Sequence, residues 1–528
     1  MSDRSRDLRL ALSRRHLLKG FGAAAVTTFA MGGMRSALAD PVFGIYPFQL
    51  GVASGDPAPD GFVIWTRLAP EPFEIGYGMP GQPVEVEWEV AEDERFRTIA
   101  RKGVAVARPE LGHSVHVELT GLLPGRPYWY RFSAGRERSL VGRAVTTPAL
   151  GAATDHVRFA VAGCQNYEQG YYTAYRKIAE EDGLDFVFCY GDYIYEGRGN
   201  RLRGTEETIR PHFGQEIYSL GDYRRRYAQY KMDTDLQAAH AAAPWFAVWD
   251  DHETDNNWAS IYDQDGTDPA IFALRRQAAA QAYYENMPLR ASALPVGSAI
   301  QIFRRASYGT LLDLNLLDTR QYRTDQPCGD RQARNCTEIN KPDAEMMGQR
   351  QHEWLIKGLK DSRAQWKTIA QQVMVMDLDR DPGPDVSVNL DSWAGYRAPR
   401  ERMLKGMRDA GVQNAIVLTG DEHQNFAGEL HIDGSKPGPK PIAVEFVGTS
   451  ITSGGDGRDQ GRGAADMLSA NQQLKFINSQ RGYLLCDVTR ERWLTDFKVL
   501  DKVSERGGTL TSRKKLAVLP GSPTLQQA

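Results

Sequence analysis

The sequence of 528 residues has little net charge and, beyond its N-terminal segment, no long apolar run. Its 64 Lys and Arg residues nearly balance 67 Asp and Glu residues, which leaves a formal net charge of -3. Because no global field attracts polyanions or membrane surfaces, the composition argues against nucleic-acid binding as the main role. Because no later apolar run is long enough to cross a bilayer, we expect a soluble mature protein without a permanent membrane anchor.

Cysteine is also scarce, and its odd count of five means that at least one thiol stays unpaired. Cys328 and Cys336 lie close together in a polar loop, where a local disulfide would suit an oxidising compartment, although the spacing leaves their pairing open. Cys189 and Cys486 lie in apolar runs and are expected to be buried small hydrophobic residues. Cys164 remains, directly after an apolar run.

The first 39 residues have the pattern of an export signal. Arg14 and Arg15 precede an uncharged stretch rich in Ala and Gly at 20–34, and an A-x-A cleavage site follows at 37–39. This pattern predicts a twin-arginine signal peptide that engages the twin-arginine export machinery; the alternative is a surface helix that happens to contain two arginines. Export by this route is expected to place the mature protein in the periplasm or outside the cell.

Two regions with different patterns follow the signal. Residues 45–148 contain short alternating runs separated by Gly and Pro turns, which predicts a small all-β sandwich of fibronectin or immunoglobulin type with an accessory role. Residues 155–503 alternate strand and helix patterns, which predicts a layered α/β domain with helical or irregular insertions at 202–243 and 259–296. The tail at 504–528, with several Ser, Thr, Lys and Arg, is expected to be poorly ordered.

Clusters of ionisable residues directly follow buried-strand patterns of the second region. Asp192 and Tyr195 offer a carboxylate and a phenolate that suit one hard trivalent ion. The other clusters are Asp250-Asp251-His252-Glu253, and Asp421 with His423, which we expect to share one side of an extended segment. So many ionisable groups at buried strand ends cost several kcal/mol unless they are paired or bound to a metal. Since polar groups after successive strands converge in layered α/β domains, we expect one site.

These clusters, in this order, resemble the calcineurin-like metallophosphoesterase pattern. The most similar family is that of the PhoD-like alkaline phosphatases, which are related to the purple acid phosphatases. The segments that carry the resemblance are Gly163-Cys164-Gln165-Asn166, Gly191-Asp192-Tyr193-Ile194-Tyr195-Glu196, Asp250-Asp251-His252-Glu253, Leu317-Asp318-Thr319-Arg320-Gln321-Tyr322-Arg323 and Gly420-Asp421-Glu422-His423. The resemblance implies a four-layer metallophosphoesterase β-sandwich flanked by helices and preceded by the small all-β domain.

The resemblance also implies the metals and their ligands. The implied ligands of an iron(III) ion are Cys164, Asp192, Tyr195 and His423. Asp192 would bridge to calcium, whose further implied ligands are Asp251, Asp421 and, more weakly, Gln165. The residue types agree with this set, because thiolate and phenolate suit a ferric ion whereas carboxylate and amide oxygens suit calcium.

The expected reaction is hydrolysis of phosphate monoesters, diesters or both by a metal-activated hydroxide or oxide, without a covalent enzyme intermediate. His252 and Asn166 are candidates to contact phosphate or steady the leaving group. Arg320 is a candidate to grip phosphate bidentately, with a structural ion pair to Asp318 as the alternative. A monomer is the expected oligomeric state.

Two positions depart from the family pattern. Many members carry an acid in the Trp-x-Gly-Tyr segment, where this chain has Ala394, which puts a second calcium ion in doubt. The purple acid phosphatase pattern has a His after the strand predicted at 368–376, where this chain has Gln371 and Gln372. Calcium in place of a softer second metal would be consistent with that loss.

Three alternatives remain open at the level of sequence. The nearest is a phosphodiesterase of the phospholipase D or teichoic-acid-cleaving type, because the same metal site serves both reactions. A calcium-binding surface protein without turnover would leave Tyr195 and Cys164 unexplained. A glycosidase that uses paired carboxylates such as Asp250 and Glu253 would be indifferent to chelation.

Overall fold

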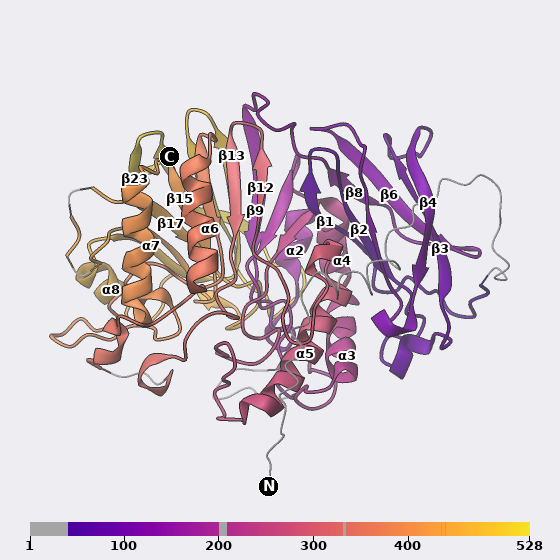
Figure 1. Cartoon of the computed structure of the whole chain (residues 1–528), viewed down its shortest axis with the longest axis horizontal. Helices are drawn as coiled ribbons and strands as arrows, with labels where there is room; N and C mark the ends of the chain where they lie inside the picture. Colours follow the sequence, from indigo (N-terminus) through magenta and orange to yellow (C-terminus); the bar gives the residue numbers. More distant parts are fainter. Residues whose placement is uncertain (1–40, 200–207, 331–333, 435, 439) are drawn as a thin grey trace, which may run out of the picture. The chain divides into compact units, whose positions relative to one another are not determined.

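Two mixed β-sheets form the centre of the structure, which is a computed structural model (Figure 1) that describes residues 41–199, 208–330, 334–434, 436–438 and 440–528. The predicted signal peptide at 1–39 lies outside the described residues. In spatial order the ten-stranded sheet contains β23 (Ser522–Gln527), β22 (Leu510–Leu519), β21 (Trp493–Leu500), β20 (Gly482–Thr489), β9 (His156–Ala162), β10 (Phe186–Cys189), β11 (Trp245–Ala247), β1 (Val52–Ala58), β2 (Gly61–Arg67) and β5 (Ser114–Glu118).

Strands β9, β10 and β11 pair in parallel at the centre of this sheet. Their carboxyl ends therefore lie at one edge, where the segments that begin at Cys164, Asp192 and Asp250 leave the strands. The first predicted chemical clusters thus arise from neighbouring strands, although they are far apart in the sequence.

The second sheet has eight strands and supplies the remaining cluster. Its spatial order is β12 (Arg304–Tyr308), β13 (Leu312–Leu316), β14 (Trp366–Ala370), β15 (Ala415–Thr419), β17 (Ala443–Val447), β16 (Asn425–Leu430), β19 (Leu474–Gln480) and β18 (Gly457–Arg458). Strands β13, β14, β15 and β17 pair in parallel, so the loops that follow them also meet at one edge.

Alternate side chains of a strand point to opposite faces of its sheet, so one face packs on the other sheet and the opposite face packs on helices. In β15, Ile416 and Leu418 belong to the core cluster that contains Phe159 and Phe188 of the other sheet, whereas Val417 belongs to a second cluster with Leu404. The first cluster includes residues of α2 (Thr173–Ala179), α3 (Leu220–Lys231), α4 (Thr234–Ala242) and α5 (Pro269–Asn286); the second includes residues of α6 (Gly348–Asp361), α7 (Arg397–Asp409) and α8 (Ala464–Ala470). Figure 1 shows α6 and α7 side by side. The predicted layered α/β fold is confirmed.

The N-terminal sandwich has a second sheet of short antiparallel strands. This sheet contains β4 (Ile99–Ala107), β3 (Val84–Ala91), β6 (Pro127–Ala134), β7 (Glu137–Arg138) and β8 (Gly142–Val145). It packs on β1, β2 and β5 through a core that joins Phe62 and Ile64 to Val86 and Tyr130. The hydroxyl of Tyr128 accepts a hydrogen bond of 2.9 Å from the backbone of Leu123, which is the tyrosine corner of such sandwiches.

The sandwich continues into the ten-stranded sheet, because β1 pairs in parallel with β11 at Gly55 and Trp245. A side chain at Gly55 would place its Cβ 2.5 Å from the Pro288 carbonyl oxygen, so this close approach requires glycine. The division between 45–148 and 155–503 stays a prediction, since one sheet runs across it.

The expectation of a poorly ordered tail at 504–528 is wrong, because β22 and β23 form a hairpin at the edge of the sheet. Strand β22 pairs with β21 and buries Leu516, Ala517 and Val518, whereas Arg513 and Lys515 are exposed. The polar composition reflects a strand with an exposed portion rather than disorder. Backbone pairing with an existing sheet edge satisfies its polar groups.

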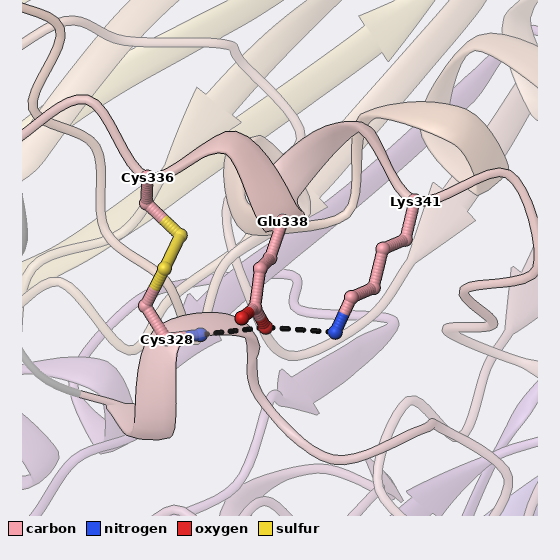
Figure 2. Close-up of a disulfide and its surroundings, with 4 residues drawn as sticks. All are labelled: Cys328, Cys336, Glu338 and Lys341. Atoms are coloured by element: carbon pink, nitrogen blue, oxygen red, sulfur yellow. Dashed lines mark hydrogen bonds and ion pairs between the residues drawn. A yellow bond between two sulfur atoms is a disulfide. The ribbon is translucent and has the colours of Figure 1, made fainter.

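The cysteines have the predicted environments. Cys328 and Cys336 form a disulfide (Figure 2), and Glu338 beside it accepts a hydrogen bond from the Cys328 amide at 3.2 Å and pairs with Lys341 at 2.8 Å. Cys164, Cys189 and Cys486 are free and buried. Within the described residues, the predicted helical insertions contain α3, α4 and α5. Among all the residues that the structure describes, none of the helices is both long enough and apolar enough to cross a bilayer.

Candidate metal centre

The loops after the strands of both sheets bring the predicted ligands together. Among the described residues, three groups of side chains have ligand atoms within 4.8 Å of one another and could each hold a metal ion. These groups are Cys164, Asp192 and His423; Asp192, Asp251 and His252; and Asp250, Asp251 and Asp421. Because Asp192 and Asp251 each belong to two groups, the groups form one continuous centre.

The backbone is strained at four of the predicted ligands. Cys164, Asp192, Asp421 and His423 have φ angles of 51°, 53°, 66° and 52°, in the left-handed region that residues with a side chain rarely adopt. Such strain persists only where the surrounding structure requires it, and it clusters at functional sites. The expectation that Asp421 and His423 share an extended segment is wrong, because a tight turn after β15 carries them.

The ring of Tyr190 fixes how closely the loops of the two sheets approach. A Cβ atom added at Gly163 would lie 2.3 Å from this ring, and one added at Gly420 would lie 2.2 Å from it. The Tyr190 hydroxyl donates a hydrogen bond to the carbonyl oxygen of Thr449, after β17. The glycines that precede Cys164 and Asp421 are therefore required by contact with one aromatic ring.

Tyr195 lies in the middle of the predicted iron ligands. Its hydroxyl donates to Asp192 Oδ2 at 2.7 Å and lies 3.2 Å from His423 Nε2. Burial and the charge of Asp192 raise the pKa of both the Tyr195 phenol and the Cys164 thiol. In the absence of a cation these groups are neutral, so binding of a metal to them would release protons.

Two central carboxylates have an oxygen atom without a hydrogen-bond partner, although Asp251 Oδ1 lies 3.8 Å from Arg320 Nη2. Asp192 Oδ1 and Asp251 Oδ1 are buried and accept no hydrogen bond within the described residues. Burial, opposed by His252 and reinforced by Asp251, raises the pKa of Asp192 to about 7. A buried carboxylate oxygen without a partner is destabilising. The residues present therefore fit one or more cations at this centre.

The two histidines occupy the more open part of the centre. The side chain of His423 is 35% exposed and that of His252 is 17% exposed. His252 Nδ1 lies 2.6 Å from Glu196 Oε2, and the ring stacks on Tyr195 with centroids 4.0 Å apart. Burial would lower the pKa of His252, but the carboxylates of Glu196, Asp251 and Asp192 raise it well above its usual value. Glu196 thus orients His252 and favours its protonated form.

Arg320 does not occupy the position predicted for a phosphate-binding residue. Its side chain is fully buried and pairs with Asp250 at 2.6 Å and with Asp391 at 2.8 Å. Asp318 accepts a hydrogen bond from the backbone amide of Arg320 instead of the predicted ion pair. The guanidinium therefore balances the charge of buried carboxylates at the centre.

The side chain of Gln165, a predicted calcium ligand, is hydrogen-bonded at both ends. Its side-chain amide donates to the Tyr193 carbonyl oxygen at 2.7 Å, and its side-chain oxygen accepts a hydrogen bond from Tyr175. Because both ends are engaged, Gln165 connects the loops after β9 and β10. Its side-chain oxygen accepts this one hydrogen bond, although an amide oxygen can accept two, so the predicted calcium contact stays a prediction.

Asn166 is partly exposed beside the centre. Its side-chain oxygen accepts a hydrogen bond of 2.9 Å from the backbone of Glu168 and thereby caps the short helix η3 (Tyr167–Gln169). Within the described residues its side-chain nitrogen donates no hydrogen bond. The predicted contact between this nitrogen and phosphate stays a prediction.

Glu253 was not predicted as part of the metal centre. Its buried carboxylate accepts hydrogen bonds from the backbone amides of Asp192 at 3.1 Å, Tyr193 at 2.7 Å and Asp250 at 2.9 Å. It therefore holds the ligand-bearing loops after β10 and β11 together. The acid-rich segment at 250–253 indicated that Glu253 lies near the centre. The sequence could not show that its carboxylate binds backbone amides rather than a metal.

Arg481 was missed for a different reason. Its Nη1 atom donates to the carbonyl oxygens of His423 and Ser453, each at 2.6 Å. The residue lies between β19 and β20, far in the sequence from both partners, and no motif surrounds it. Only the approach of three separate segments reveals that it supports the centre.

Ala394, one of the two positions that depart from the family pattern, lies in an apolar cluster. It packs with Cys336, Ile339, Val388 and Leu390 beneath the disulfide loop. An acid at this position would be buried in the cluster. The apolar neighbours suit Ala394.

Comparison with known proteins gives one family for most of the chain. A family described as PhoD-like phosphatase matches residues 159–497, and one described as PhoD-like phosphatase, N-terminal domain, matches residues 35–148. Alkaline phosphatase D of Bacillus subtilis (strain 168) is 46% identical over 505 residues, which cover 95% of this chain and 86% of that protein. A solved structure described as Structure of PhoD superposes with a TM-score of 0.90 at 46% identity, covering 92% of this chain and 93% of that chain. The resemblance predicted from the strand-end motifs is confirmed, and the chain belongs to the PhoD-like phosphatase family.

Proposed function

We propose that this protein is an exported, metal-dependent phosphoesterase of the alkaline phosphatase type. Hydrolysis of phosphoric esters follows from its membership of the family and from the 46% identity to an alkaline phosphatase D. The observation that carries the metal dependence is the pair of buried oxygen atoms on Asp192 and Asp251 that accept no hydrogen bond within the described residues, among side chains that fit a cation. Phosphate monoesters and diesters are both proposed as substrates.

The proposed ligands divide by chemistry between two kinds of ion. Cys164, Asp192, Tyr195 and His423 would hold Fe3+, because thiolate and phenolate suit a ferric ion. Asp251 and Asp421, with Asp192 as the bridge, would hold Ca2+, which prefers carboxylate oxygens. When bound, such ions neutralise charge on the phosphoryl oxygens and lower the pKa of a water molecule toward about 7.

The side chains at the open part of the centre would complete the reaction. Because His252 Nδ1 is engaged by Glu196, its Nε2 atom is the one that can face a substrate. We assign to Nε2 the donation of a proton to the leaving oxygen. The amide nitrogen of Asn166 would donate a hydrogen bond to a phosphoryl oxygen. No side chain is proposed to form a covalent bond with phosphorus.

Three observations support export. The twin-arginine pattern occupies 1–39, the disulfide between Cys328 and Cys336 suits an oxidising compartment, and none of the described helices could span a membrane. We therefore propose that the mature protein works in the periplasm or outside the cell after passage through the twin-arginine machinery.

The first test compares Cys164→Ala with Cys189→Ala, since both residues are free, buried thiols but only Cys164 lies in the centre. We expect Cys164→Ala to lose iron and at least about 100-fold in hydrolysis of p-nitrophenyl phosphate, whereas Cys189→Ala keeps both. Metal analysis and rates before and after chelation provide the measurement. Metal-free protein that hydrolyses the ester at the full rate would overturn the proposal.

The same preparation distinguishes monoester from diester chemistry. The rates for p-nitrophenyl phosphate and bis(p-nitrophenyl) phosphate are compared on the metal-loaded protein. A much higher kcat/KM for the bis-ester would favour the phosphodiesterase alternative on this site.

A further inference from the structure

The phenol oxygen of Tyr195 contacts a buried serine, Ser453, in addition to Asp192. Ser453 Oγ is 2.7 Å from the Tyr195 hydroxyl oxygen and 2.8 Å from the carbonyl oxygen of Cys164. It also accepts a hydrogen bond of 3.1 Å from the backbone amide of Asn166. The residue is fully buried, so water does not compete for these contacts.

The hydroxyl of Ser453 can donate only one hydrogen bond, so its acceptor has to be identified. Its hydroxyl has one hydrogen, which it donates either to Tyr195 or to the carbonyl oxygen of Cys164. Tyr195 has its own hydrogen directed at Asp192 Oδ2 in the metal-free state. A tyrosine oxygen that has given up this hydrogen to bind a cation is a stronger acceptor than a backbone carbonyl. The serine hydrogen then points to Tyr195.

The loop that carries Ser453 is fixed by both sheets. Arg481 donates to the Ser453 carbonyl oxygen at 2.6 Å and to that of His423 at the same distance. The neighbouring Thr452 hydroxyl donates to the Asn166 carbonyl oxygen at 2.7 Å. The Arg481 contacts fix the backbone of Ser453, so the serine oxygen does not need to move when Tyr195 binds a metal.

We propose that Ser453 is a positioning residue whose hydroxyl donates a hydrogen bond to the metal-binding oxygen of Tyr195. The bond fixes the direction of that oxygen and reduces the electron density that it donates to the ion. Ser453 acts through Tyr195 and touches neither substrate nor metal. This inference rests on the proposed function, in which Tyr195 is a ligand of Fe3+.

The test uses the full mature protein and the absorption band that arises from charge transfer between a phenolate and Fe3+. We expect Ser453→Ala to shift this band to longer wavelength, because a phenolate without the donor is richer in electrons. We also expect it to weaken iron binding by about 10-fold, because the loss of a fixed direction for the tyrosine oxygen outweighs its gain in electron density. Ser453→Thr, which keeps the hydroxyl, should leave the band near its original position. These are spectroscopic and binding readouts, independent of catalytic rate.

Thr452→Val is the matched control, because it removes a buried hydrogen bond from the same loop without touching Tyr195. It should lower thermal stability and leave the band unchanged. A band at the same wavelength in Ser453→Ala as in the unmodified protein would overturn the inference while leaving the iron centre intact. Unmodified protein with no iron and no such band would overturn both the inference and the ligand set of the proposed function.

Discussion

At the scale of single residues, the centre depends on a balance of buried charges. Asp250, Asp251 and Asp391 face the guanidinium of Arg320, which has no exposed surface. Burial acts to raise the pKa of Asp251, but His252 and Arg320 hold it well below its usual range. Arg320 therefore keeps a proposed metal ligand ionised without touching the metal.

We expect Arg320→Gln to destabilise the metal-free protein by about 3–5 kcal/mol, because it leaves buried carboxylates without their counter-charge. Arg408→Gln is the control, since Arg408 pairs with Asp409 at the surface, where an ion pair contributes about 0–1 kcal/mol. Thermal or denaturant unfolding measures both. Equal unfolding midpoints for the two variants would contradict the role assigned to Arg320.

At the scale of elements, the C-terminal hairpin extends the ten-stranded sheet and reaches the other one. Leu516 and Val518 of β22 belong to the core cluster that contains Phe159 and Phe446. The backbone amide of Leu525 in β23 donates to Glu429 of β16 at 3.1 Å. The hairpin thus covers an edge that would otherwise be open, and its loss would expose unpaired backbone groups of β21.

Two neighbouring residues of β22 test whether the C-terminal hairpin is folded onto the sheet. Val518 is 1% exposed and Leu519 is 39% exposed. We expect Val518→Ala to lower the free energy of unfolding by about 2 kcal/mol and Leu519→Ala by less than about 0.5 kcal/mol. Denaturant unfolding compares the two. No effect from either variant is the result that a disordered tail would give.

At the scale of the whole molecule, a histidine links the N-terminal sandwich to the catalytic region. His116 of β5 has its Nε2 atom 3.0 Å from the Tyr284 carbonyl oxygen and 2.9 Å from that of Met287, at the end of α5. Its ring stacks on Tyr284 with centroids 4.6 Å apart. Burial, partly opposed by these carbonyl contacts, lowers the pKa of His116 to about 4.

This pKa predicts a loss of stability in mild acid. The folded form holds His116 neutral, so its contribution is complete above the unfolded pKa of about 6.5 and falls as the pH drops toward about 4. The loss is at most about 3 kcal/mol. Denaturant unfolding of chelated protein between pH 7.5 and 5 should show a smaller pH dependence for His116→Gln than for the unmodified chain. Identical slopes would exclude His116 as the cause.

The site was largely predictable because its chemical groups are local in the sequence. Asp192 and Tyr195 follow one strand, and Asp421 and His423 follow another, so recognition of the strands placed these side chains at sheet edges. Parallel pairing then brings such edges together whatever the intervening length of chain. The two cysteines of the disulfide are also close together in the sequence.

The sequence by itself determined the layered fold, the family and the set of strand-end side chains that converge. Tertiary structure alone decided the partners of each side chain. Arg320 has a group suited to phosphate, but buried acids from distant segments pair with it, and the amide nitrogen of Gln165 donates to Tyr193. Ser453 supports the centre without belonging to any motif. The physical reason is that strand patterns depend on adjacent residues, whereas burial and hydrogen bonding depend on which distant segments approach.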